Sequence, residues 1–363
     1  MVFTDDHQCH FILSEIKKIG IVGAGKMGIS IFYSLLFTDY QVLFYHYRDA
    51  NSKQKSIGKK IKRLIKNQVI SQEAAHIKNI TRSLDDLSDS DLIIEAIPED
   101  KDKKVSLFQQ LDETLKETCI VTTNSSSLLP SELVPSSRRW GCFAGLHFFF
   151  PVGYRNVVEL ITTNHIKESV VRRLKAFLKT INKRYLLLNE ENAFVLNKLL
   201  LEVQAEACQL HFQNGFALKE IDHAVKEHLF GMGVFEMMDH IGLDVLYRSI
   251  QNYIAPMKDS SYYHPLLHIL KHKMREGALG VKKRKGFYDY GVGKIEQSGF
   301  GDLPDEKLVV ELVERLARGY VKKAQNTVLQ TGISKKELEE AIKEFLGTEQ
   351  GPFALAEKLW GKK

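Results

Sequence analysis

A glycine-rich turn near the start of the chain limits the fold more than any other feature of the sequence. The short apolar run "KIGIV" at residues 18–22 leads directly into "GAGKMG", so Gly23, Gly25 and Gly28 have the G-x-G-x-x-G spacing. The first glycine permits a tight turn, the second lets backbone approach a pyrophosphate, and the third lets the following helix pack closely on the strand. A turn that follows a strand and opens a helix predicts a dinucleotide-binding site, with the phosphates at the helix N-terminus.

The first half of the chain alternates between short apolar runs and helix-forming segments. Further strands are predicted at residues 41–47, 91–97, 119–123, 142–148, 157–161 and 184–188, and helices at 29–37, 53–66 and 101–117. This alternation is typical of an α/β fold in which helices cover both faces of a mostly parallel sheet. Together with the glycine turn, it predicts a doubly wound sheet of the Rossmann type.

The second half of the chain is predicted to be all-helical, because apolar residues recur at three and four spacing from residue 192 onward. It contains an internal repeat. The segment "NGFALKEIDHAV" (214–225) matches "TGISKKELEEAI" (331–342), and "GVFEMMDHIG" (233–242) matches "GPFALAEKLW" (351–360). Two tandem helical units are therefore expected, joined by a glycine-rich linker at 290–306. The predicted domains are 1–189, 190–290 and 291–363, the last resembling 197–242.

The composition excludes several classes of protein. A formal net charge of +6 is mild, so it permits an anionic ligand without indicating nucleic acid. The four cysteines lie far apart, which favours neither a metal site nor a disulfide framework. The first fifteen residues do not have the pattern of a signal peptide, and no apolar run reaches membrane-spanning length. We therefore expect a cytoplasmic protein that binds neither nucleic acid nor membrane.

In a Rossmann-type fold, the end of the second strand lies near the ribose of the nucleotide. An Asp or Glu there would bind the 2′-hydroxyl of NAD. The sequence "LFYHYRD" instead places His46 at this point, with Arg48 just beyond, and these residues suit the 2′-phosphate of NADP. We expect NAD and leave NADP open, with Lys26 and Met27 of the glycine turn also lining the cofactor site.

A single histidine stands in the apolar run "GLHFFFPVGYRNVVEL" at residues 145–160. His147 is either a core histidine bonded to backbone or a general base in a dry site, because an imidazole titrates near working pH. Glu159 lies twelve residues further on. It is either the carboxylate that orients this imidazole or an edge-strand side chain that faces solvent.

Several runs, taken together, resemble the 3-hydroxyacyl-CoA dehydrogenase family. They are "IGIVGAGKMG", "LIIEAIPEDKDKK", "TTNSSSLLPSEL", "GLHFFFPVGYRNVVEL", "FVLNKLL", "GVFEMMDHIGLDV" and "KKRKGFYDY". They occur in the order that the family shows, from about residue 18 to residue 290. The tandem copy that follows resembles an extra helical unit of some relatives.

The resemblance implies roles for particular residues. His147 matches the catalytic base and Glu159 its acidic partner. Ser126 matches a serine that contacts the substrate oxygen, and Asn197 an asparagine that closes the site from the helical domain. Positions around the nicotinamide and its ribose are matched by Glu99, Lys104 and Asn124.

The chemistry of such a site follows from the reaction. Oxidation of a secondary alcohol needs a base for the hydroxyl proton and an acceptor for the hydride, which the nicotinamide provides. A neutral imidazole takes the proton, and a carboxylate beside it orients the ring and stabilises its charge. Ser126 and Asn197 are expected to hydrogen-bond the reacting oxygen or the thioester carbonyl. The basic segment at 53–66 is either a solvated helix face or a contact for the coenzyme A phosphates, through Lys62 and Lys66.

The sequence departs from the family pattern at several places. Phe150 follows "HFF" where an asparagine is usual, Asn192, Ala193 and Phe194 stand where Pro-Gly-Phe is usual, and Val234 replaces a proline. These changes, with the missing acidic ribose ligand, suggest an altered substrate or weaker activity on straight acyl chains.

The sequence therefore predicts an NAD(P)-dependent 3-hydroxyacyl-CoA dehydrogenase that acts reversibly on a (3S)-3-hydroxyacyl-CoA of short to medium chain length. A dehydrogenase of a free 3-hydroxy acid, and a nucleotide-binding homologue with impaired catalysis, stay open. An acyl-CoA substrate is the expected partner, and no metal is expected. A homodimer through the helical half is expected, or a monomer if the second helical unit replaces the partner contact.

Overall fold

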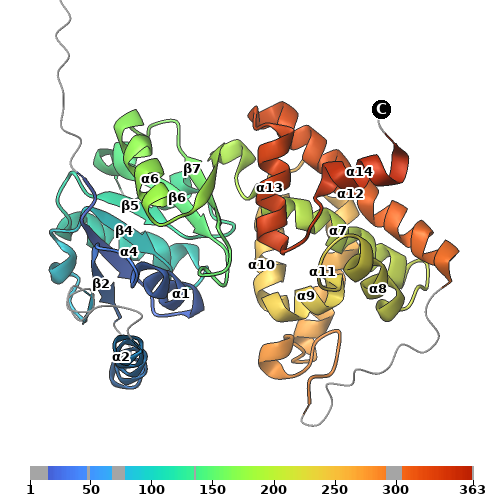
Figure 1. The fold of residues 1–363 in the computed structure, drawn as a ribbon, viewed down its shortest axis with the longest axis horizontal. Coiled ribbons are helices and arrows are strands. Elements are labelled where there is room, and N and C mark those ends of the chain that lie inside the picture. Colours follow the sequence, from blue (N-terminus) through green and yellow to red (C-terminus); the bar gives the residue numbers. More distant parts are fainter. Residues whose placement is uncertain (1–14, 47–49, 68–77, 135, 292–304, 362–363) are drawn as a thin grey trace, which may run out of the picture. The chain divides into compact units, whose positions relative to one another are not determined.

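A computed structural model describes residues 15–361 except 47–49, 68–77, 135 and 292–304 (Figure 1). Arg48 and most of the predicted linker at 290–306 lie outside the described residues. The chain divides into two compact units. The first unit comprises residues 1–124, 130–154 and 162–183, and the second comprises 125–129, 155–161 and 184–363. The predicted domain boundaries stay predictions.

Eight strands form one sheet in the order β3-β2-β1-β4-β5-β6-β7-β8. Their bounds are β1 (Lys18–Val22), β2 (Gln41–Tyr45), β3 (Lys78–Thr81), β4 (Leu92–Glu95), β5 (Ile120–Thr123), β6 (Phe143–Phe148), β7 (Val157–Thr162) and β8 (Arg184–Asn189). The five pairings that join β1 to β6 are all parallel. The order reverses between β1 and β4, which is the topological switch of a doubly wound fold. The predicted Rossmann-type fold is thus confirmed.

Helices alternate with these strands, as the sequence predicts. They are α1 (Lys26–Leu35), α2 (Ala50–Lys66), α4 (Lys101–Thr114), the short α5 (Pro130–Leu133) and α6 (Glu168–Thr180). The predicted segments 29–37, 53–66 and 101–117 correspond to α1, α2 and α4. The sequence reasoning missed β3, because "KNIT" carries a single strongly apolar residue and lacks the signal of a buried strand.

The second half of the chain is helical, as predicted (Figure 1). Its helices are α7 (Val195–Phe212), α8 (Leu218–His228), α9 (Val234–Ile241), α10 (Leu243–Ile254), α11 (His264–Arg275), α12 (Glu306–Thr331), α13 (Lys335–Leu346) and α14 (Pro352–Trp360). Helix α7 packs against α8, α9, α11 and α12. Every residue of α7 except Phe212 is buried or half-buried, so this helix forms the core of the unit. None of the described helices is both long and apolar enough to cross a membrane.

The two copies of the internal repeat use the same capping device. Asp222 of α8 accepts hydrogen bonds from the backbone N–H groups of Phe235 and Glu236, which open α9. Glu339 of α13 accepts from Gly351, Phe353 and Ala354 at the start of α14. Each carboxylate satisfies N–H groups that a helix N-terminus leaves unpaired. The repeat in sequence is therefore a repeat in structure.

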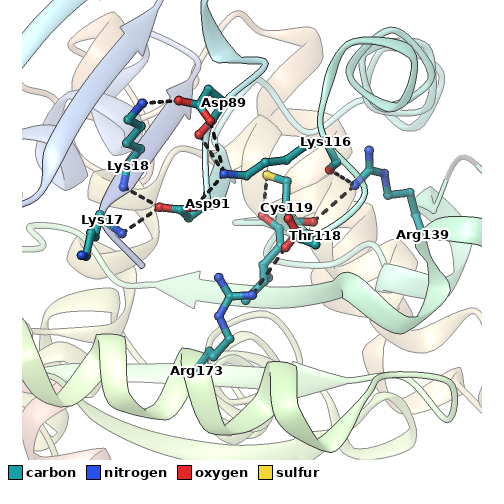
Figure 2. Close-up of polar contacts among 10 residues, drawn as sticks. Lys17, Lys18, Asp89, Asp91, Lys116, Thr118, Cys119, Arg139 and Arg173 are labelled. Carbon is teal, nitrogen blue, oxygen red and sulfur yellow. Dashed lines mark hydrogen bonds and ion pairs between the residues drawn. The ribbon is translucent and has the colours of Figure 1, made fainter. Parts of the chain in front are cut away.

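A charged network stabilises the amino ends of the central strands (Figure 2). Asp91 accepts hydrogen bonds from the backbone N–H groups of Lys17 and Lys18, each at 2.9 Å, and from Lys116 Nζ at 2.7 Å. Burial raises the pKa of the Asp91 carboxyl, but these hydrogen bonds outweigh it, so the pKa lies below its usual value. The network therefore joins the starts of β1, β4 and β5.

Arg139 extends this network into the interior. Its side chain is almost fully buried, and its guanidinium binds the Asp112 carboxylate. It also donates to the carbonyl oxygens of Leu115 at 2.7 Å and Lys116 at 2.9 Å. These carbonyls lie just after Thr114, the last residue of α4, where cations are favoured.

We expect Arg139→Ala to lower the free energy of unfolding by about 3–5 kcal/mol, because it leaves the buried Asp112 carboxylate without its main cation. Urea denaturation followed by circular dichroism measures this. Arg138→Ala is the matched control: Arg138 also bonds Asp112, but its side chain is 51% exposed. Equal effects of the two substitutions would refute a special role for the buried guanidinium.

Candidate active site

The glycine turn has the geometry of a phosphate cradle. Gly23 has φ +120°, which non-glycine residues rarely adopt. A Cβ on Gly28 would collide with the Gly23 carbonyl oxygen, so this position packs α1 against the turn. A Cβ on Gly25 would meet no protein atom within 4 Å. Gly25 caps α1 and is exposed with Lys26, while Met27 is half-buried. The open space at Gly25 fits a pyrophosphate at the start of α1.

His46 follows the last residue of β2, at the carboxyl edge of the sheet. Its backbone N–H donates to the Thr81 carbonyl oxygen at 3.1 Å, and its side chain is half-buried. The structure thus places His46 where the sequence predicts a ribose contact.

A buried ion pair lies at the carboxyl end of β4. Lys104 Nζ binds Glu95 Oε1 at 2.6 Å, and both side chains are almost fully buried. Glu95 also accepts from Thr123 Oγ1 at 2.6 Å and from the Ile97 N–H at 2.7 Å. Glu99 lies further out, with Oε2 3.6 Å from Lys104 Nζ. The predicted residues Glu99 and Lys104 therefore lie together.

Glu95 is a residue that the sequence reasoning missed. Its signal was a single carboxylate within the buried strand run "LIIEAI", which needs a partner because an unpaired buried charge is costly.

Asn124 and His147 lie at the carboxyl ends of β5 and β6. Asn124 Oδ1 accepts the Phe148 N–H at 2.8 Å, so the asparagine fixes the residue after His147. The His147 side chain is 4% exposed, and its ring centroid lies 4.4 Å from that of Phe149. The structure therefore brings these two predicted residues together.

Glu159 lies in β7 and is fully buried. The alternative of a solvent-facing edge carboxylate is wrong. Glu159 Oε1 accepts the backbone N–H of Leu196 at 2.9 Å. Leu196 is the second residue of α7, so Glu159 binds an N–H group that the N-terminus of this helix leaves without an intrahelical partner.

Ser126 and Asn197 share one partner in the second unit. Tyr253 Oη donates to the Ser126 carbonyl oxygen at 2.6 Å and accepts from Asn197 Nδ2 at 3.0 Å. The neighbouring Asn252 Nδ2 donates to Ser127 Oγ at 2.8 Å. The sequence reasoning found the serine and the asparagine but missed Tyr253 and Asn252, which no motif marks.

Lys62 and Lys66 are exposed on helix α2. Lys60 of the same helix places its Nζ 3.7 Å from the centroid of the Tyr33 ring in α1. Within the described part of the chain, no contact of Lys62 or Lys66 indicates a ligand, so their role stays a prediction.

The structure shows where the residues that depart from the family pattern lie. Phe150 is 54% exposed, so its ring does not fill the core of its unit. Phe194 has φ +60° and ψ +35° and caps α7 in the left-handed region, which is rare for an aromatic residue. Val234 is buried at the start of α9. Across the described residues, no group of three or more His, Cys, Asp or Glu side chains is arranged to hold a metal.

Comparisons with known proteins show the family of the chain. Residues 18–191 match the model of the 3-hydroxyacyl-CoA dehydrogenase NAD binding domain, and residues 194–290 match that of the C-terminal domain. The hydroxyacyl-coenzyme A dehydrogenase, mitochondrial, of Rattus norvegicus is 30% identical over 289 residues, covering 76% of this chain and 91% of that protein. The chain belongs to the 3-hydroxyacyl-CoA dehydrogenase family.

Two solved structures are similar. That of (S)-3-hydroxybutyryl-CoA dehydrogenase from Ralstonia eutropha is 28% identical, with a TM-score of 0.68, and covers 76% of this chain and 100% of that one. That of 3-hydroxybutyryl-CoA dehydrogenase from Escherichia coli K12 has a TM-score of 0.75 and covers 95% of this chain and 92% of that one. At 17% identity, the latter shows the fold alone.

We expect Gly25→Ala to fold like the wild type but to bind NADH at least tenfold more weakly, since the added methyl group occupies the space left for the pyrophosphate. Fluorescence titration with NADH and urea denaturation measure the two effects. Gly28→Ala is the comparison, because its Cβ collides with backbone and should lower stability. Unchanged NADH affinity in Gly25→Ala would rule out this cradle.

Proposed function

We propose that the protein is an NAD-dependent dehydrogenase that interconverts a (3S)-3-hydroxyacyl-CoA and the 3-oxoacyl-CoA, with a short to medium acyl chain. The observation that carries this proposal is the burial of both candidate groups, His147 at 4% exposure and Glu159 at 0%. They lie on consecutive strands of a chain that belongs to the 3-hydroxyacyl-CoA dehydrogenase family.

In the proposed mechanism, the glycine turn at Gly23, Gly25 and Gly28 would hold NAD, whose nicotinamide would supply the hydride acceptor. His147 takes the hydroxyl proton, and Glu159 orients the imidazole and stabilises its positive charge. The hydrogen bond from the Leu196 N–H fixes the position of the Glu159 side chain. Ser126 and Asn197 hold the substrate oxygen or the thioester carbonyl. In the reverse direction, the imidazolium of His147 protonates the ketone oxygen.

The cofactor preference is proposed from two features. The open space at Gly25 and the match to an NAD binding domain support NAD. His46 stands in place of an acidic ribose ligand, so we propose NADP as a second, weaker cofactor. Glu99, Lys104 and Asn124 are proposed to lie around the nicotinamide and its ribose, and Lys62 and Lys66 are proposed to contact the coenzyme A phosphates.

We expect the wild type to consume NADH with acetoacetyl-CoA, measured by absorbance of the reduced nicotinamide. His147→Gln should lower kcat by about 10²–10⁴-fold, because it removes the group that transfers the proton. His165→Gln is the matched control, since His165 is an exposed histidine of the first unit. If neither NADH nor NADPH is consumed by the wild type, the proposed substrate is wrong; if His147→Gln keeps its turnover, the base is misassigned.

A dehydrogenase of a free 3-hydroxy acid is the second candidate, and the exposed Phe150 in place of the usual asparagine favours testing it. Replacing coenzyme A with a short thiol separates the two. Loss of turnover with the short thioester supports the hypothesis of an acyl-CoA substrate. Retained turnover supports the hypothesis of a free 3-hydroxy acid.

We propose that the protein is a monomer in which the second helical unit replaces a partner chain. Helix α12 runs antiparallel to α7: Arg315 pairs with Glu206 at 2.9 Å, and a Cβ on Gly319 would lie 3.4 Å from Glu202. Because α12 covers α7 within one chain, α7 offers no open apolar face of its own for a dimer.

Sedimentation velocity at low micromolar concentration should therefore give a single species of 41.5 kDa. A species of twice that mass, stable on dilution, would support the homodimer instead. Measurement with and without NADH distinguishes an intrinsic dimer from one that forms only with cofactor.

A further inference from the structure

Tyr253 near the end of α10 joins two candidate substrate-binding residues. Its side chain is 5% exposed, and its hydroxyl hydrogen-bonds to both of them. It donates to the Ser126 carbonyl oxygen at 2.6 Å and accepts from Asn197 Nδ2 at 3.0 Å. A hydroxyl has one proton to donate and lone pairs to accept, so both bonds can form at once. Tyr253 thereby connects the serine loop to the first turn of α7.

The preceding residue strengthens this connection. Asn252 Nδ2 donates to Ser127 Oγ at 2.8 Å, so two consecutive residues of α10 hold the loop at residues 125–129. Within the loop, Ser125 Oγ accepts the Leu128 N–H at 2.9 Å. The loop is therefore held by a hydrogen bond of its own and by hydrogen bonds from α10.

We propose that Tyr253 is a positioning residue, which sets the Ser126 backbone and the Asn197 amide for the acyl-CoA substrate. This rests on the proposed function, because Ser126 and Asn197 act on substrate only if that function is right. The bond from Asn197 commits one of its two amide protons to Tyr253. The amide plane is then fixed, and the remaining N–H and the oxygen have defined directions.

The hydroxyl is the part of Tyr253 that matters for this role. The ring itself packs near Phe194, with the centroids 6.0 Å apart, and this contact survives in phenylalanine. Tyr253→Phe therefore removes both hydrogen bonds while keeping the apolar contacts. It removes the bonds by which Tyr253 holds the Ser126 carbonyl oxygen and the Asn197 amide.

We expect Tyr253→Phe to lower kcat with acetoacetyl-CoA by about 10–100-fold, because small misplacements of positioning groups have effects of this size. KM for NADH should stay within twofold of the wild type, about the precision of such a comparison. Tyr263→Phe is the matched control: its hydroxyl donates to Glu202 at 2.8 Å in the same unit, and not to Ser126 or Asn197. The proposal fails if both variants lose kcat equally or if Tyr253→Phe keeps it.

A double-mutant cycle tests the route through Asn197. If Tyr253 acts by orienting that amide, Tyr253→Phe should have little further effect on kcat in an Asn197→Ala background. Fully additive losses would contradict this route. A second cycle combines Tyr253→Phe with Asn252→Ala. It distinguishes the effect of holding the loop at residues 125–129 from the effect of orienting the Asn197 amide.

Hydrogen exchange of the free protein keeps this proposal distinct from the proposed function. Amides of residues 125–129 should exchange faster in Tyr253→Phe than in Tyr263→Phe or the wild type. Lack of wild-type turnover with every acyl-CoA tested, combined with faster loop exchange, would reject the function but keep the positioning by Tyr253. Unchanged loop exchange would reject the positioning whatever the activity.

Discussion

The hydrogen bond from the Leu196 N–H to the Glu159 carboxylate is the interaction on which the start of α7 depends. Glu159 is fully buried, and a buried carboxylate without partners is costly. The start of α7 supplies a donor at 2.9 Å and the positive end of a helix dipole. The same start requires Phe194 to adopt φ +60°, a conformation that costs roughly 1–3 kcal/mol. Stabilisation of Glu159 and packing of α7 compensate for this strain.

The tandem helical copy at 291–363 also packs against α7. Helix α12 packs along α7, and burial, together with the positive charge of Lys323, lowers the pKa of Lys198 to about 8. Glu159 acts in the opposite direction on this lysine. A charge balance around the first turns of α7 thus involves both copies of the repeat. The tandem copy therefore does more than extend the chain, because it completes the surroundings of a helix that carries Asn197.

The sequence predicted the parts of this structure that follow from local pattern. The spacing of Gly23, Gly25 and Gly28 indicated the cradle, and alternation of strands and helices indicated the sheet. The residues that it missed are Glu95, Tyr253 and Asn252, and the contacts of the last two join segments far apart in the chain. Glu95 meets Lys104 nearby, but Tyr253 reaches Ser126 across 127 positions. No periodicity or motif encodes such a contact, so only the fold reveals it.

The two ends of the strands carry different groups of polar residues. At the amino ends of β1, β4 and β5, Asp91, Lys116 and Arg139 bind backbone groups and one another. At the carboxyl ends, the strands lead into the glycine turn, Glu95, Asn124 and His147. Ligands of open parallel sheets bind at the carboxyl edge, near the switch in strand order. The charged network therefore lies at the opposite ends of the strands from the candidate site. His46 and Phe150, which depart from the family pattern, both lie in segments that follow these carboxyl ends.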